Sequence, residues 1–221
     1  MNAHTEFDPM LIASAPRSGS SMTAGIIAKT GVHCGWTKPG DEWNAKGYFE
    51  HVPIDTAQIL YLRSCDHKHE GKRFQPLDLD EPYPDFRDFI QDCIKSEYPE
   101  SNGWMFKSTK TAICRNIWVN HFPEAKWVIC RRDRELILDS MMRAPFMDAY
   151  SERDEWDQML NRYEYYFRDI IDRCTAFEFD VDAAVNGSVE EVRSLFSFLN
   201  ISYSPARAHS FIDRSLIRAR N

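Results

Sequence analysis

The sequence predicts an α/β fold in which a mostly parallel sheet is flanked by helices. Short apolar stretches typical of buried strands alternate with longer stretches whose apolar residues recur at helical spacing. Two segments, residues 11–30 and 128–143, share one design: a buried strand, a polar turn and a helix. Strands separated by helices favour parallel pairing with helices on both faces of the sheet. No repeat or convincing boundary divides the chain, so we expect one domain over residues 1–221.

The first half of the chain begins with its clearest strand and helix. Leu11, Ile12 and Ala13 form a buried strand. Ser20 or Ser21 caps the helix that follows, because serine side chains satisfy the free N–H groups of a first turn. The other elements expected here are, in order, a strand at residues 32–34, helices at 52–62 and 86–94, and a strand at 104–106 that leads into Lys107.

The second half of the chain continues the alternation of helices and strands. Its expected elements are, in order, a helix at residues 112–122, a strand at 126–130, helices at 134–143 and 152–174, a strand at 176–179, a helix that ends near residue 199, and a short helix after Pro205. Ser188 and Glu191 have the spacing of a capping box, so they mark the start of the helix that ends near residue 199.

Two long segments lack a regular pattern. Residues 35–49 carry Trp36, Trp43, Tyr48 and Phe49, which either form the wall of a ligand site or close the loop onto the core. Residues 64–84 are polar and rich in His, Lys, Asp and Pro, which favours a mobile excursion or a lid.

The composition excludes several classes of partner. A formal net charge of −7 gives no general attraction to nucleic acids or anionic membranes, so an anionic ligand requires a local basic cluster. No apolar run approaches the roughly 18 to 20 residues of a membrane span. The cysteines are widely spread and no apolar signal region opens the chain, so we expect reduced thiols in the cytoplasm. The oligomeric state is left open.

One cluster, formed by Cys65, His67 and His69, has the residue types of a metal site. It lies in a polar segment with no second pair of ligands nearby. A structural metal site usually has four ligands, so we expect a solvated loop and no bound metal.

The turn after the first strand predicts an anion-binding loop. Backbone N–H groups at the start of the helix favour an anion there, and the hydroxyls of Ser18, Ser20 and Ser21 add donors around Gly19. Arg17 adds a fixed charge that can bind two oxygens at once. The loop lacks the first glycine and the lysine of the nucleoside-triphosphate motif. An ordinary strand-to-helix turn with a surface arginine is the alternative.

The second segment of this design predicts a second anion site. Its strand ends in Arg131 and Arg132, and Ser140 follows on the next helix. Ligands of open parallel sheets bind beyond the carboxyl ends of the strands, so both sites would face one crevice. The alternative is a solvated turn in which the arginines pair with Asp133 and Glu135.

The paired motifs resemble those of sulfotransferases that use 3′-phosphoadenosine 5′-phosphosulfate (PAPS). Pro-Arg-Ser-Gly-Ser-Ser is similar to their 5′-phosphosulfate loop, and the arginine and serine eight residues apart, Arg132 and Ser140, are similar to their 3′-phosphate motif. Residues 47–50, 104–107 and 177–201 resemble further segments of small bacterial members. The resemblance covers most of residues 11–201. It implies a P-loop-like sulfotransferase fold.

The resemblance also implies roles for individual residues. The sulfuryl group and 5′-phosphate would be contacted by Arg17, with Lys107 nearby, and the 3′-phosphate by Arg132 and Ser140. The cradle would be supplied by Ser18, Gly19, Ser20 and Ser21. The expected cofactor is PAPS, with 3′-phosphoadenosine 5′-phosphate (PAP) as product, and no metal is implied.

Two departures from the family leave roles unassigned. Thr109 stands where cytosolic small-molecule sulfotransferases have a histidine, and their C-terminal Arg-Lys-Gly segment is missing, although Arg214, Arg218 and Arg220 could partly substitute. The general base is therefore open. Glu50 is the first choice, although it could instead cap the next helix. The alternatives are His51, His33, Asp41 and Glu42.

The expected reaction is transfer of a sulfuryl group to a hydroxyl or amine of a small-molecule or glycan acceptor. Repulsion by an acidic chain argues against a highly sulfated polysaccharide as that acceptor. Two alternatives are kept. One is a P-loop kinase of a small molecule, and the other is a protein that binds PAPS or PAP without catalysis.

Overall fold

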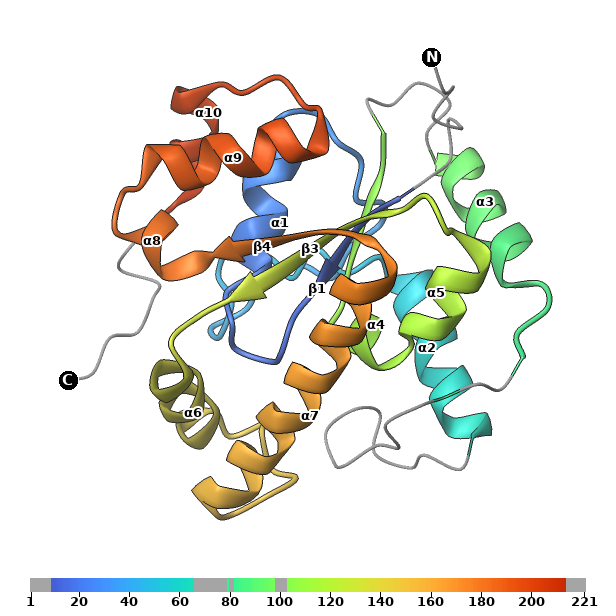
Figure 1. The fold of residues 1–221 in the computed structure, drawn as a ribbon, viewed down its shortest axis with the longest axis horizontal. Coiled ribbons are helices and arrows are strands. Elements are labelled where there is room, and N and C mark those ends of the chain that lie inside the picture. Colours follow the sequence, from blue (N-terminus) through green and yellow to red (C-terminus); the bar gives the residue numbers. More distant parts are fainter. Residues whose placement is uncertain (1–8, 66–78, 80–81, 98–102, 214–221) are drawn as a thin grey trace.

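The computed structural model describes residues 9–65, 79, 82–97 and 103–213. Its sheet contains β1 (Met10–Ala13), β2 (Met105–Lys107), β3 (Lys126–Arg131) and β4 (Thr175–Asp180). The strand order is β2-β1-β3-β4, and all three pairings are parallel (Figure 1). Because the pairing is parallel, the carboxyl ends of all four strands lie at one edge, and the predicted α/β class is confirmed.

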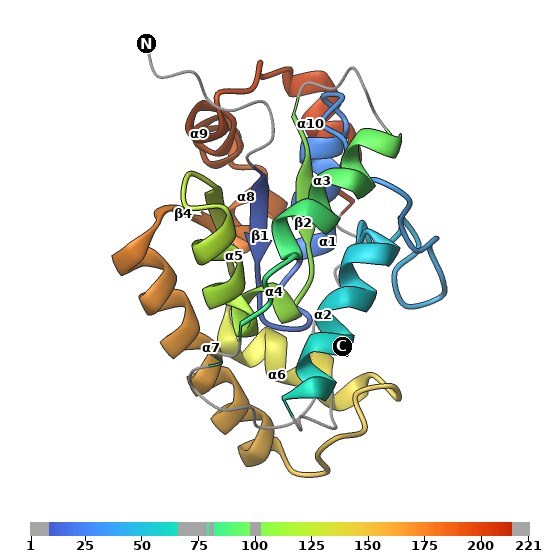
Figure 2. The ribbon, with the colours of Figure 1, turned by 90° about the vertical axis from the view of Figure 1, so that its right-hand side faces the viewer.

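Helices cover both faces of the sheet (Figures 1 and 2). One face carries α1 (Ser20–Ala28), α8 (Val181–Val185), α9 (Val189–Leu199) and α10 (Pro205–Phe211). The other face carries α2 (Val52–Ser64), α3 (Phe86–Glu97), α4 (Lys110–Ile113), α5 (Arg115–His121), α6 (Arg134–Arg143) and α7 (Arg153–Arg173).

The two faces form two apolar clusters because successive strand residues point to opposite sides. Leu11 and Ala13 belong to the cluster under α2–α7, whereas Ile12 belongs to the cluster under α1 and α8–α10. In β3, Ile129 joins the first cluster and Val128 the second. A strand that is buried on both faces reads as a continuous apolar run, which explains why β1 and β3 were predictable.

Two predicted elements need correction, and one helix lacks a prediction. Residues 32–34 form no strand; only His33 pairs, in a single bridge with Trp104, because the chain turns at Gly31 (φ 92°) and Gly35 (φ 70°). The helix expected at 112–122 is two helices, α4 and α5, which are separated by Cys114. The short helix α8 was not predicted; Asp180 caps it by accepting from the N–H of Ala183.

Several expectations fall outside the described residues. Most of the possible lid at 64–84 lies there, as do His67 and His69. All six cysteines are described, and none is in a disulfide. Among the described helices, none has the length and apolar character needed to cross a membrane. The part of the chain that is described also contains no group of three His, Cys, Asp or Glu side chains placed to hold a metal.

Candidate active site

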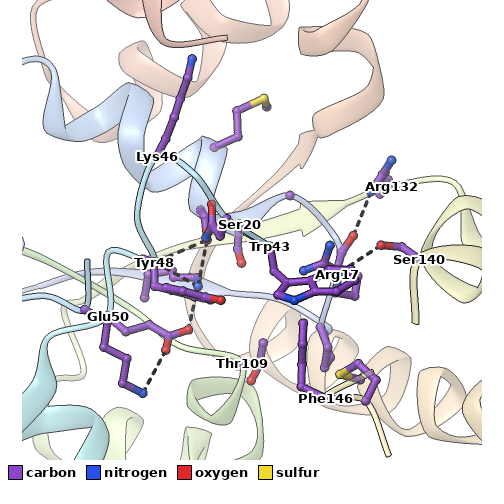
Figure 3. A pocket seen from close by; sticks show the side chains of 18 of the residues that line it. Arg17, Ser20, Trp43, Lys46, Tyr48, Glu50, Thr109, Arg132, Ser140 and Phe146 are labelled. Carbon is purple, nitrogen blue, oxygen red and sulfur yellow. Dashed lines mark hydrogen bonds and ion pairs between the residues drawn. The ribbon is translucent and has the colours of Figure 1, made fainter. Parts of the chain in front are cut away.

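A cavity of about 400 Å³ lies where the segments after β1, β2 and β3 meet (Figure 3). Six cations line it, in a chain whose net charge is negative: Arg17, Lys38, Lys46, Lys107, Lys110 and Arg132. The carboxylates among its described lining residues are Glu50 and Asp213. The cavity is therefore the local basic cluster that an anionic ligand requires.

The loop after β1 leaves the first turn of α1 facing this cavity. Gly19, with φ 85°, is the N-cap residue, and no side chain caps the helix. The expected cap by Ser20 or Ser21 is therefore wrong, because the left-handed glycine starts the helix one residue earlier. The first N–H groups of a helix have no partner within it, so they are available to an anion. A Cβ on Gly19 would lie 2.5 Å from Val181 Cγ1, so α8 packs directly against this loop.

The serines of this loop have different tasks. Ser20 and Ser21 line the cavity, as expected of a cradle. Ser18 is buried and does not line it; its hydroxyl donates to the carbonyl of Ala15 (2.7 Å) and so folds the turn. The structure thus places Ser18 in support of the loop and not at its surface.

Arg17 lies in contact with both Arg132 and Ser140. Arg17 Nε donates to Ser140 Oγ (3.0 Å), and an Nη of Arg132 donates to the carbonyl of Arg17 (2.9 Å) (Figure 3). Arg17 holds this position with φ 67°, a conformation that is strained in any residue except glycine. Behind them, Asp182 of α8 lies 3.4 Å from Arg132 Nε and accepts from the N–H of Asp133. The strain and the shared contacts fix two cations at one end of the cavity.

The neighbouring arginines do not join this cluster. Arg131 binds Glu164 and Glu178 and lies over the ring of Phe167. Arg134 binds Asp157 (2.5 Å). The alternative in which these arginines pair with Asp133 and Glu135 is not what the structure shows. Arg131 ends β3 and points toward α7, whereas Arg132, just after the strand, points toward Asp182 of α8.

Lys107 and Glu50 form a buried ion pair on the other side of the cavity. Lys107 Nζ lies 2.7 Å from Glu50 Oε1, and it also donates to the carbonyl of Tyr48 (3.2 Å) and to Ser21 Oγ (3.3 Å) (Figure 3). Glu50 does not cap α2, so that alternative is wrong. Lys107 therefore connects the start of α1 to a carboxylate that faces the cavity.

His51 is held away from the cavity by two structural contacts. Its Nδ1 caps α2 by accepting from the N–H of Ile54 (3.3 Å), and its Nε2 lies 3.1 Å from Glu97 Oε1. Burial lowers the pKa of His51 although Glu97 opposes the shift. His33 faces the same Glu97 from 3.5 Å and is likewise buried. Neither histidine lines the cavity, so the geometry gives neither of them the position of a general base.

The remaining candidate acids are placed differently from Glu50. Asp41 accepts from the hydroxyl of Tyr48 (2.6 Å) and from the N–H groups of Trp43 and Asn44, so it folds the 35–49 loop. The hydrogen bond from Tyr48 lowers the pKa of Asp41. Burial and this carboxylate together raise the pKa of Tyr48 to about 12. Neither Asp41 nor Glu42 lines the cavity.

Aromatic side chains from distant loops complete the walls. Trp43 and Phe146 meet edge to face with ring centres 5.6 Å apart, and Arg17 lies over Phe146. Phe211 of α10 lines another wall. Of the aromatic residues expected in the 35–49 loop, Trp43 and Tyr48 line the cavity, whereas Trp36 is 67% exposed elsewhere and Phe49 packs against Phe211. Arg214, Arg218 and Arg220 lie outside the described residues.

Solved structures of similar shape identify the fold. The sulfotransferase domain of the olefin synthase of Synechococcus PCC 7002 matches 97% of this chain and 88% of its own, with a TM-score of 0.53 and 17% identity. Sulfotransferase STF9 of Mycobacterium avium matches 93% of this chain and 67% of its own, with a TM-score of 0.59 and 9% identity. This chain has the sulfotransferase fold.

A third sulfotransferase structure agrees with the first two. STF1 of Mycobacterium tuberculosis H37Rv matches 93% of this chain and 70% of its own, with a TM-score of 0.53 and 11% identity. No protein-family model matches the chain, and neither does any curated protein sequence. The sulfotransferase fold is thus shared at identities where most side chains differ, so the chemistry has to be argued from this chain's own cavity.

Proposed function

We propose that this protein transfers the sulfuryl group of PAPS to a hydroxyl or amine of a small-molecule or glycan acceptor. The convergence of Arg17, Lys107 and Arg132 on one cavity carries the proposal. Lys107 ends β2, whereas Arg17 and Arg132 follow β1 and β3, and all three surround the uncapped start of α1. Lys107 lies on one side of the cavity and Arg132 on the other, so a ligand with two separated phosphate groups would meet a cation at each side.

The residues divide into two tasks. Arg17, Ser20, Ser21 and Lys107 would bind the 5′-phosphosulfate, and Arg132 with Ser140 would bind the 3′-phosphate. As the acceptor attacks, an acceptor–sulfur bond forms, the bond from sulfur to the 5′-phosphate oxygen breaks, and negative charge grows on that phosphate. Fixed cations and N–H donors stabilise such charge without reorganising, so Arg17 and Lys107 supply the main electrostatic contribution.

Glu50 would take the acceptor's proton. Its Oε1 is bound by Lys107, whereas Oε2 lies 3.8 Å from Lys38. Oε2 is therefore the oxygen to which the proton would move. The position of this carboxylate in the cavity lining, beside Lys107, supports the role of general base.

Calorimetric titration with PAP tests the cofactor. The protein should bind PAP more tightly than AMP, which lacks the 3′-phosphate, and more tightly than ATP. Arg132→Ala should weaken PAP binding by about 10- to 100-fold, the usual effect of removing a charged hydrogen-bond donor. Arg131→Ala is the matched control, because this neighbour points away toward Glu164 and Glu178.

The two alternatives have different outcomes in the same experiments. A small-molecule kinase would prefer ATP with magnesium and show no dependence on the 3′-phosphate. A protein that only binds the nucleotide would bind PAP normally but release none from PAPS when acceptors are supplied. Either result would contradict the proposed transferase.

A further inference from the structure

A continuous network of contacts leads from the phosphate cradle to the far side of Glu50. It begins at Ser21 and Lys107 and passes to Glu50 through the 2.7 Å ion pair. It continues to Lys38, whose Nζ lies 3.8 Å from Glu50 and 3.3 Å from Asp55. Asp55 is the buried carboxylate beyond it. Glu50 therefore separates the cradle lysine from a second group of charges.

Asp55 anchors two lysines at that far side. It is 1% exposed, lies outside the cavity lining and accepts from Lys110 Nζ (3.2 Å), Lys38 Nζ and the hydroxyl of Ser108 (2.8 Å). Burial alone would raise the pKa of Asp55, but Lys110, Ser108 and Lys38 together lower it. Its carboxylate therefore holds both ammonium groups at the cavity wall, although neither comes from the cradle loops.

The network contains more positive than negative charge. Three ammonium groups, on Lys38, Lys107 and Lys110, face the two carboxylates of Glu50 and Asp55. Each ammonium carries three donors, so Lys38 and Lys110 retain donors for a ligand after binding Asp55. Lys107 is paired with Glu50, so Lys38 and Lys110 share the carboxylate of Asp55 and leave one positive charge at the cavity wall that a second anion would balance.

We propose that Lys38 and Lys110 form a subsite for an anionic group, such as a carboxylate, on the acceptor. The inference rests on the proposed function, in which Glu50 receives the acceptor's proton. An acceptor whose hydroxyl approaches Glu50 would place a nearby carboxylate against the two lysines. Asp55 is the positioning residue of this subsite. The proposal narrows the acceptor to small hydroxy or amino compounds that carry their own negative charge.

A matched pair of probes tests this subsite. We would titrate 3-hydroxybenzoate and its neutral counterpart 3-hydroxybenzamide into protein saturated with PAP, and separately into ligand-free protein. The wild type should bind the acid about tenfold more tightly than the amide, as expected for one charged hydrogen-bonded contact. Equal affinities, or no measurable binding of the acid, would overturn the proposal.

Substitutions of Lys38 and Lys110 test whether these lysines cause the preference for the acid over the amide. Lys38→Gln with Lys110→Gln should reduce the preference to less than about threefold. The Lys38 side chain is 46% exposed, so the protein with Lys38→Gln alone should fold normally. This variant should lose part of the preference for the acid over the amide. Lys46→Gln is the control, since Lys46 lines another wall and is held by the carbonyl of Phe211 (2.7 Å) and by Asp213. A preference that survives the double substitution would also overturn the subsite.

PAP binding separates this inference from the proposed function. If the double variant loses affinity for PAP as strongly as it loses affinity for the acid, the lysines belong to the cofactor site and the proposed subsite is wrong. If the wild type binds no PAP, the cofactor proposal fails, while the comparison of acid and amide on ligand-free protein still decides whether the lysines hold an anionic group.

Discussion

The two sides of the cavity hold their cations in different ways. Beside β3, Arg17 Nε donates to the hydroxyl of Ser140, and Arg132 donates to a main-chain carbonyl and lies 3.4 Å from Asp182. Beside β2, the lysines are paired with carboxylates such as Glu50. On the first side, hydrogen bonds to these uncharged oxygens fix where the two guanidinium groups lie. On the second side, the carboxylates of Glu50 and Asp55 offset most of the positive charge of the lysines. This arrangement favours the positioning of side chains and proton transfer over the general attraction of an anion.

The largest expected effect comes from breaking the paired side at Lys107. Lys107→Met should lower the rate of PAP formation from PAPS about 100- to 1000-fold, as for the loss of one preorganised donor. It should also lower the free energy of unfolding by about 3–5 kcal/mol, because Glu50 is left buried without its partner. Acceptor turnover and urea denaturation would measure the two effects.

A second substitution separates these two effects. Adding Glu50→Gln to Lys107→Met should recover much of the lost stability, because the unpaired charge is removed, and none of the lost rate. Recovery of both stability and rate, or of neither, would show that the Lys107–Glu50 pair does not contribute separately to stability and to catalysis.

A smaller effect is expected on the arginine side, where Gly19 contacts α8. Gly19→Ala should lower the free energy of unfolding by about 1–3 kcal/mol, since the new Cβ meets Val181 and φ is 85°. Gly103→Ala is the matched control: its φ is 95°, but the new Cβ would meet only the flexible end of Met10 at 3.3 Å. Urea denaturation should show a clearly larger loss for Gly19→Ala; equal losses would mean that the contact with α8 is unimportant.

The smallest expected effect is a pH dependence of stability. It comes from His33 and His51, which flank the 35–49 loop that carries Lys38. Burial lowers the pKa of His33 and His51, which both face Glu97. Below the ordinary histidine pKa of about 6.5, the unfolded chain takes up protons before the folded chain does, so stability falls as the pH falls. We expect a loss on the order of 1 kcal/mol between about pH 7.5 and pH 5.

The control for this pH effect keeps the helix cap. Asparagine is a good N-cap residue, so His51→Asn preserves a side-chain acceptor for α2 while removing one titrating group. Urea denaturation at the two pH values should show a smaller difference for this variant. An unchanged difference would assign the pH dependence to other groups.

Much of the framework was predictable because its signals are local. The runs at β1 and β3 are buried on both faces and are followed by turns and helices, so their order along the chain already implied a parallel sheet. The meeting of Arg17, Arg132 and Ser140 followed from that topology, since strand ends share one edge. The errors were local too: a single bridge at His33 and a five-residue helix, α8, fall below the length that periodicity detects.

The sequence by itself determined the α/β class and the two polar turns that bring cations to the ends of β1 and β3, because residue spacing within one segment dictates strand, turn and helix. Only the tertiary structure decided that Lys38 lies between Glu50 and Asp55, that Lys110 also binds Asp55, and that His51 caps a helix away from the cavity. Contacts between residues far apart in the chain depend on how the helices pack, and no local pattern encodes such distances.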